Sequence, residues 1–210
     1  MAKKQGGLNP KNKAAVTTAQ KLAIPTWGWL ASGGVLAVLL VVGLLYLGNS
    51  QNSIIQSDIE GAVIFPDPGR GHKDGDLAYD QDAPVGGIHN PEWQNCGIYD
   101  KPLRRENLIH SMEHGAVWIA YQPDLPADQV DILRNLVRQD QAGTQERWIV
   151  LAPQPGLEDP VVATAWRVQL RLSNADDPRL AQFVKEYEQG PYYPEPGATC
   201  TFGGIGEPIS

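Results

Sequence analysis

The sequence predicts an α+β domain that follows a single membrane-spanning helix, and three features of the chain support this prediction. An apolar stretch without any charge covers residues 27–47. After it, apolar runs of strand character are mixed with two stretches of helical periodicity, an order typical of a mixed sheet with separate helices. The third feature is residues 67–92, which are dense in Gly, Asp and Pro and are expected to form a long ordered loop.

The apolar stretch has the length and the flanks of a membrane anchor. About 20 helical residues cross the hydrocarbon core of a bilayer. Trp27, Trp29 and Tyr46 stand near the two ends of the stretch, where amphipathic rings favour the headgroup region. Five lysines and no acid precede residue 27, so we expect the N-terminus to stay in the cytoplasm and the domain to lie outside it. A cleaved signal peptide is disfavoured because the basic leader is long and no small-residue cleavage site closes the run.

The chain is therefore expected to have four segments. Residues 1–26 form a disordered basic tail, 27–48 the membrane helix, 49–58 a polar stalk and 59–210 one domain with its own core. The domain is acidic, since five of the 17 basic residues precede the anchor and all 24 acidic residues follow it. Nucleic acid is excluded as a partner because phosphate binding needs a basic face.

Hydrophobic patterning predicts the regular elements of the domain. Residues 116–121 are β-branched and aromatic and are closed by Pro123, which is typical of a strand. Residues 127–139 carry apolar side chains at helical spacing, with acidic residues near the start. By the same criteria we expect strands at 61–65 and 148–152, one long strand or two within 161–172, and a second helix from 177 to about 187 with Pro178 in its first turn. The Gly- and Pro-rich residues 190–210 are expected to wrap over the surface.

All four histidines lie between His72 and His114, and the predicted elements after residue 121 contain none. Imidazole is a usual ligand of zinc and copper, and metal sites draw such residues together from loops. One interpretation is a copper or zinc site made by His72, His89, His110 and His114, with Glu113 holding an imidazole in its binding tautomer. The other interpretation is that these histidines are solvated or hydrogen-bonded to the backbone without a metal. The sequence leaves both open.

The metal interpretation depends on the conformation of the chain between His110 and His114. On one helical turn this spacing places both rings on one face, as two-histidine metal sites require. In an extended chain the two side chains also share a face but lie about 13 Å apart, which is too far to share an ion. A turn that ends at Gly115 is therefore needed, and glycine suits the left-handed cap of such a turn.

The segment from His110 to His114 also matches the inverted zinc-peptidase pattern His-x-x-Glu-His, in which the glutamate acts as general base. That arrangement needs a helix that continues past the second histidine, whereas Gly115 and a strand-like run follow at once. No third ligand stands out downstream, although Glu186 and Glu188 are candidates. A zinc-dependent hydrolase therefore ranks third among the functions, and we do not expect an enzyme.

Three motifs of the chain resemble a known bacterial family. They are Ala83-Pro-Val-Gly-Gly-Ile-His89, Cys96-Gly-Ile-Tyr-Asp-Lys-Pro102 and Leu108-Ile-His-Ser-Met-Glu-His-Gly-Ala-Val-Trp-Ile-Ala-Tyr121. Together they resemble the pattern of the domain of unknown function 3105 family, with departures at Val85, Gly86 and Met112 that leave every histidine in place. The resemblance implies a basic tail, one helix in the bacterial cytoplasmic membrane and this domain on the far side. It supplies no activity.

The two cysteines, Cys96 and Cys200, lie outside the cytoplasm in this topology, where disulfides form. A bridge between them would tie the C-terminal segment to the histidine-rich loop and contribute roughly 3–5 kcal/mol by chain-entropy arguments. The alternatives are Cys96 as a metal ligand and two free thiols.

Transition-metal binding by a membrane-anchored domain is the most specific function that these patterns indicate. The main alternative from another class is an accessory or assembly protein of an envelope or respiratory complex, with a structural histidine network and no metal. In that case the partner is a membrane-protein complex.

Overall fold

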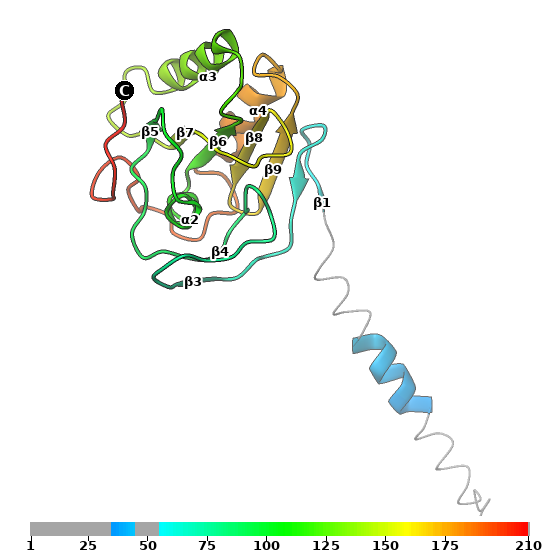
Figure 1. Cartoon of the computed structure of the whole chain (residues 1–210). Helices are drawn as coiled ribbons and strands as arrows, with labels where there is room; N and C mark the ends of the chain where they lie inside the picture. Colours follow the sequence, from blue (N-terminus) through cyan, green and yellow to red (C-terminus); the bar gives the residue numbers. More distant parts are fainter. Residues whose placement is uncertain (1–34, 45–54, 210) are drawn as a thin grey trace, which may run out of the picture. The chain divides into compact units, whose positions relative to one another are not determined.

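The computed structural model describes residues 35–44 and 55–209. Residues 35–44 form a helix that belongs to a separate unit of the chain, and residues 55–209 form the domain (Figure 1). Within these two ranges, no helix combines the length and the apolar character needed to cross a membrane. The predicted tail 1–26, most of the predicted membrane helix 27–48 and part of the stalk 49–58 lie outside the described residues.

A seven-stranded mixed sheet is the centre of the domain, in the order β1-β2-β9-β8-β6-β7-β5. Its strands are β1 (Ile55–Gln56), β2 (Val63–Ile64), β5 (Gly97–Ile98), β6 (Val117–Tyr121), β7 (Ile149–Pro153), β8 (Val161–Ala165) and β9 (Val168–Leu172). β7 pairs in parallel with β5 and β6, and the remaining pairs are antiparallel. This mixed sheet confirms the predicted α+β class.

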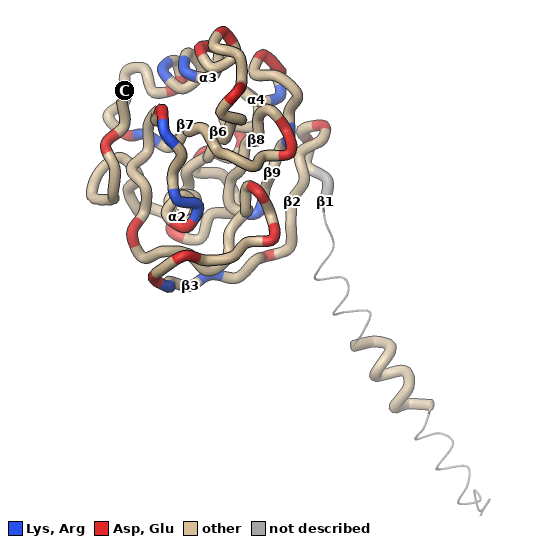
Figure 2. The backbone as a smooth tube through the Cα atoms, viewed as in Figure 1, with Lys and Arg blue, Asp and Glu red and all other residues tan. Residues whose placement is uncertain are grey.

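The middle strands β6, β7 and β8 are wholly buried and carry no charged residue, as Figure 2 shows. Their side chains alternate between two hydrophobic clusters, because successive residues of a strand point to opposite faces. In β6, for example, Val117 and Ile119 belong to one cluster, and Trp118 and Ala120 belong to the other. The sheet therefore has two covered faces.

Two amphipathic helices cover the first face. They are α3 (Ala127–Asp140), predicted from its spacing of apolar residues, and α4 (Pro178–Tyr187), predicted from Pro178 in its first turn. Leu133 of α3 and Phe183 of α4 are fully buried in the same cluster as Val117 and Ile119 of β6. Asp177 caps α4 by accepting a hydrogen bond from the backbone N–H of Arg179, and a proline occupies its first turn as expected.

The second face is covered by a third helix, α2 (Arg105–Glu113), where we had predicted only two helices in the domain. Leu108, Ile109 and Met112 of this helix pack in one cluster with Trp118 of β6. Every residue from Glu106 to the end of α2 is buried, polar ones included. The helix therefore shows no apolar stripe against a polar face, and hydrophobic patterning could not reveal it.

Other elements differ from the predictions in detail. Residues 161–172 form two strands joined by a turn in which Arg167 has a φ of 69°, and β2 is shorter than the predicted strand 61–65. β1 lies in the segment expected to be a stalk, so the sheet begins before residue 59. The segment 67–92, expected to be a loop, contains a parallel pair of short strands, β3 (Arg70–His72) and β4 (Gly87–His89).

The C-terminal segment runs along residues 93–96 on the second face of the domain. The N–H of Cys96 donates to the carbonyl of Cys200 at 2.7 Å, and the N–H of Ile205 donates to the carbonyl of Trp93 at 2.8 Å. We call residues 193–205 the C-terminal strap. Figure 1 shows this strap, in red tones, beside the loops around α2.

Candidate metal centre

The four histidines that the sequence singled out lie in one cluster. His72 and His89 are the last residues of β3 and β4, and the parallel register pairs them directly. Their ring centroids are 4.9 Å apart, and the ring of His110 on α2 lies 4.8 Å from the first and 4.9 Å from the second. The ring of His114 lies 4.6 Å from that of His110. Residues more than forty positions apart in sequence thus meet within a few ångströms.

A helical turn brings His110 and His114 together, which resolves the conformational question that the sequence left open. The N–H of His114 donates to the carbonyl of His110 at 3.2 Å, and α2 ends at this turn. Gly115 follows with a φ of 107°, the left-handed conformation that glycine adopts without strain. A Cβ at Gly115 would also approach the ring of Tyr193 in the C-terminal strap to 3.1 Å. The glycine therefore serves both the turn and the packing of the strap.

Backbone carbonyls fix the orientation of the three buried imidazoles. His89, His110 and His114 are at most 4% exposed. In each of them Nδ1 contacts a main-chain oxygen: Gly87 at 2.8 Å, Asn90 at 2.8 Å and Thr199 at 2.7 Å, in that order. A carbonyl oxygen only accepts hydrogen bonds, so Nδ1 carries the proton in all three rings. In its neutral form, each ring then presents the lone pair of Nε2, which is the tautomer that binds metals.

Glu113 lies among these rings and is 2% exposed. Its Oε2 is 2.9 Å from Nε2 of His89 and 3.6 Å from Nε2 of His72, whose side chain is 47% exposed. Burial acts to raise the pKa of Glu113, but the adjoining histidines, His89 foremost, outweigh burial and lower the pKa. The carboxylate is therefore ionised at neutral pH.

The close approach of His89 to Glu113 does not have hydrogen-bond geometry. Nε2 of His89 and Oε2 of Glu113 are both fully buried, and neither has a hydrogen-bond partner among the described residues. If the ring of His89 is neutral, these two atoms repel each other at 2.9 Å, so a cation, either a proton on Nε2 or a metal ion, must lie between or beside them. Such a pair of orphaned buried atoms calls for an explanation, and an unseen ion is one of the few available.

Four ligand atoms come together at this point. The donor atoms of His72, His89, His110 and Glu113 all lie within 4.8 Å of one another. Zinc holds nitrogen and oxygen ligands at about 2.0–2.2 Å, so small side-chain movements would close this group around one ion. Burial, the largest effect, lowers the pKa of His110 to about 4. His110 is therefore neutral at neutral pH, as a ligand must be.

A second group shares His110. The donor atoms of His110, His114 and Glu195 also lie within 4.8 Å of one another, and Nε2 of His114 is 3.7 Å from Oε2 of Glu195. Three of the four histidines thus lie beside Glu113, while His114 and the shared His110 lie beside Glu195. Sequence reasoning gave Glu113 only a supporting role and missed Glu195. No signal in the sequence identifies Glu195, because it stands alone in the Gly- and Pro-rich strap.

Two tryptophans form the apolar surroundings of the cluster. The ring of Trp93 lies 5.7 Å from that of His110 and 5.0 Å from that of His114, and the ring of Trp166 lies 6.1 Å from that of His89. Apolar walls of this kind exclude water and strengthen electrostatic interactions within a site. They also place two fluorophores beside any bound ion.

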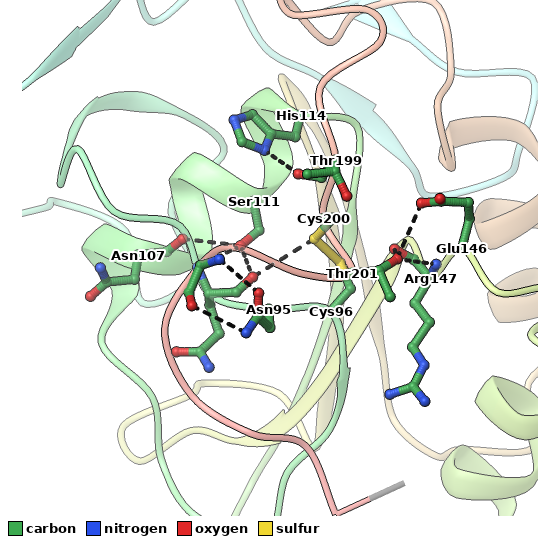
Figure 3. The surroundings of a disulfide bond; sticks show 12 residues. Asn95, Cys96, Asn107, Ser111, His114, Glu146, Arg147, Thr199, Cys200 and Thr201 are labelled. Carbon is green, nitrogen blue, oxygen red and sulfur yellow. Dashed lines mark hydrogen bonds between the residues drawn. A yellow bond between two sulfur atoms is a disulfide. The ribbon is translucent and has the colours of Figure 1, made fainter.

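The cysteines form a disulfide, with an S–S distance of 2.04 Å, which confirms the predicted pairing and leaves no thiol of Cys96 for a metal. Figure 3 shows that the bridge lies close to His114, one of the four clustered histidines. Cys200 directly follows Thr199, whose carbonyl accepts the Nδ1–H of His114. The disulfide therefore holds the part of the strap that orients His114.

Comparison with known protein families adds an identification. Residues 72–202 match the family described as Protein of unknown function (DUF3105). The chain belongs to this family. The matched segment begins at His72 and includes the whole histidine cluster, both cysteines and Glu195. No curated protein and no solved structure matches the chain.

Proposed function

We propose that the domain binds one transition-metal ion, copper or zinc, through His72, His89, His110 and Glu113. The observation that carries this proposal is the contact between Nε2 of His89 and Oε2 of Glu113, two buried acceptor atoms 2.9 Å apart without a hydrogen bond. If the ring of His89 were protonated instead, its N–H would be expected to point along a hydrogen bond to the carboxylate. A bound cation removes the repulsion and satisfies both atoms.

The chemistry of the donor set fits this class of ion. Three imidazole nitrogens and one carboxylate oxygen suit zinc and copper and are too rich in nitrogen for magnesium or calcium. The backbone contacts of Nδ1 in His89 and His110 hold these rings in the binding tautomer before an ion arrives. His72 is the one exposed ligand, so it gives an ion access to an otherwise buried group.

We also propose the cellular setting that the sequence predicts. The lysine-rich residues 1–26 and the uncharged residues 27–47 support a single helix in the bacterial cytoplasmic membrane, with the domain outside the cytoplasm. A disulfide fits that compartment, where thiols are oxidised. Reporter fusions after residue 210 test this topology: activity of a periplasmic-type reporter supports it, and activity of a cytoplasmic reporter alone contradicts it.

One observation favours the second candidate, a structural histidine network in an assembly protein. Two of the Nδ1 contacts, from His110 to Asn90 and from His114 to Thr199, link α2 to the segment after β4 and to the C-terminal strap, and such links stabilise a fold without any metal. The network leaves the His89–Glu113 contact unexplained, so we rank it below metal binding. A zinc hydrolase needs Glu113 free as a general base, whereas its carboxylate lies against His89.

The two candidates are separated by titrating the full-length chain, purified without a His tag, with Cu(II) and Zn(II). Metal binding predicts micromolar or tighter affinity in the wild type, weakened by at least about a hundredfold in Glu113→Gln, which keeps the shape of the side chain and removes a ligand charge. Glu92→Gln is the matched control, since Glu92 is exposed and lies in the same region of the chain. Equal weak binding in all three proteins would instead support the structural network.

A further inference from the structure

We infer that the cluster offers two successive positions for one ion, which share His110, and that the ion passes between them. This inference rests on the proposed function. The first position is the group of His72, His89, His110 and Glu113, and the second is the group of His110, His114 and Glu195. Each position alone has enough ligands for zinc or copper, with water to complete the coordination.

The shared ligand makes the two positions mutually exclusive. Nδ1 of His110 donates to the carbonyl of Asn90 at 2.8 Å, and both groups are buried. Only the lone pair of Nε2 remains for a metal, because an imidazole that bridges two ions must give up the Nδ1 proton and this hydrogen bond. His110 therefore serves one ion at a time. A bound ion occupies either position, and a two-metal centre is excluded while the contact with Asn90 lasts.

The C-terminal strap builds the second position. His114 receives its orientation from the carbonyl of Thr199 at 2.7 Å, and the strap supplies the carboxylate of Glu195. The backbone N–H of Glu195 also donates to the carbonyl of Glu113 at 3.2 Å, so the two carboxylate ligands are joined through the main chain. The disulfide of Cys96 anchors this strap beside the cluster.

The most exposed ligand of each position, which we call its outer ligand, indicates a path for the ion. The side chain of His72 is 47% exposed and that of Glu195 is 41% exposed, while the shared His110 is 4% exposed. Each position thus has one ligand in contact with solvent, and the two outer ligands come from different segments of the chain. An ion captured at one outer ligand can move across His110 and leave at the other without free diffusion through the buried cluster. The second position has fewer ligands, so its affinity is lower.

The histidine cluster therefore passes a copper or zinc ion from one position to the other, rather than holding it as a permanent cofactor. The test uses the full-length chain and four proteins: wild type, Glu113→Gln, Glu195→Gln and the double variant. Both substitutions keep side-chain shape, and Glu92→Gln is again the control. The readouts are the number of zinc ions bound at saturation, the affinity, and the rate of zinc release to an excess of a chromogenic chelator.

We expect wild type to bind a single ion. Glu113→Gln should still bind a single ion at the second position, with affinity at least about a hundredfold weaker than wild type, and the double variant should lose it. Glu195→Gln should keep the wild-type affinity and release zinc at least about tenfold more slowly, because the outgoing ligand is gone.

Two results would overturn the relay while leaving the proposed function intact. One is simultaneous binding of two ions by wild type. The other is complete loss of binding in Glu113→Gln alone, since the second position would then hold no ion. Absence of zinc and copper binding in wild type would overturn both proposals, so the two failures are distinguishable.

Discussion

The two faces of the central sheet are covered in opposite ways. On one face, α3 and α4 contribute an apolar cluster that contains almost every large buried aliphatic side chain of β6 to β9. On the other face, α2 buries polar groups beside its apolar ones, among them His110 and Glu113. Burial of polar groups is costly unless they find partners. The comparison therefore assigns stability mainly to the first face and ligand binding to the second.

The largest effect is expected from the apolar face. Phe183 of α4 is fully buried, so Phe183→Ala should lower the free energy of unfolding by about 3–5 kcal/mol through lost burial and a cavity. Ile132→Ala on α3 is the control, since Ile132 is 36% exposed, and should cost less than about 1 kcal/mol. Chemical denaturation measures both. A loss of similar size in the two variants would show that the first face is not the main source of stability.

Removal of the disulfide tests what the bridge contributes to the stability of the second face. Cys96→Ala and Cys200→Ala each remove the same cross-link between residues 104 positions apart, so each should cost about 2–5 kcal/mol. The double variant should be no less stable than either single one. Clearly different losses in the two single variants would mean that the individual side chains, rather than the bridge, stabilise the strap. Loss of the disulfide should change the affinity for zinc at the position of Glu113 less than it changes the rate of zinc release through Glu195.

Zinc should stabilise the protein only when its ligands on the second face are intact. Zinc at about a hundred times its dissociation constant should stabilise the wild type by about 2.7 kcal/mol. The same addition should leave Glu113→Gln nearly unchanged, and a chelator should reverse the gain in wild type. Thermal unfolding with and without zinc measures the difference. Equal stabilisation of both proteins would place the bound ion away from Glu113.

The smallest effect concerns a carboxyl pair at the ends of α3 and α4. Burial first, and then Asp140, raise the pKa of Glu188 to about 7. Because this folded-state pKa lies above the unfolded value of 4.5, the folded state binds the proton more tightly. The contribution of Glu188 to stability is therefore most favourable below about pH 4.5 and is lost as the pH rises through 7.

Glu188→Gln removes this pH dependence. After allowance for solvent screening, the variant should be more stable than wild type by less than about 1 kcal/mol near pH 8 and equal to it near pH 4. Denaturant unfolding at the two pH values measures the change. Glu186→Gln is the control, since Glu186 is exposed. A gain that is the same at both pH values would rule out ionisation as its cause.

The same contrast explains what could be predicted from the sequence. The elements of the first face, α3, α4 and the strands they cover, have regular apolar periods that patterning detects. The second face lacks such periods: α2 is buried with its polar residues, and β3 and β4 have three residues each in a segment rich in Gly and Asp. Short strands of this kind form because of tertiary contacts, which a single sequence does not display.

The candidate site was predictable in part for the same reason. Imidazole chemistry and the spacing of His110 and His114 singled out all four histidines, and the structure gathers them. The division into two groups depends on which side chains meet in space. Glu195 lies about eighty residues after His114 in the chain, and only the disulfide-anchored strap brings it close. That contact follows from tertiary packing, so no sequence pattern distinguishes Glu195 from the other acidic residues.

The binding proposal depends above all on one metal ion that joins His89 to Glu113. The most direct measurement is a crystal structure of the zinc-loaded protein with diffraction data collected at the zinc absorption edge. We expect one anomalous peak about 2.0–2.2 Å from Nε2 of His89 and from Oε2 of Glu113. A structure at the same zinc concentration in which these two atoms remain in direct contact, with no peak between them, would contradict it.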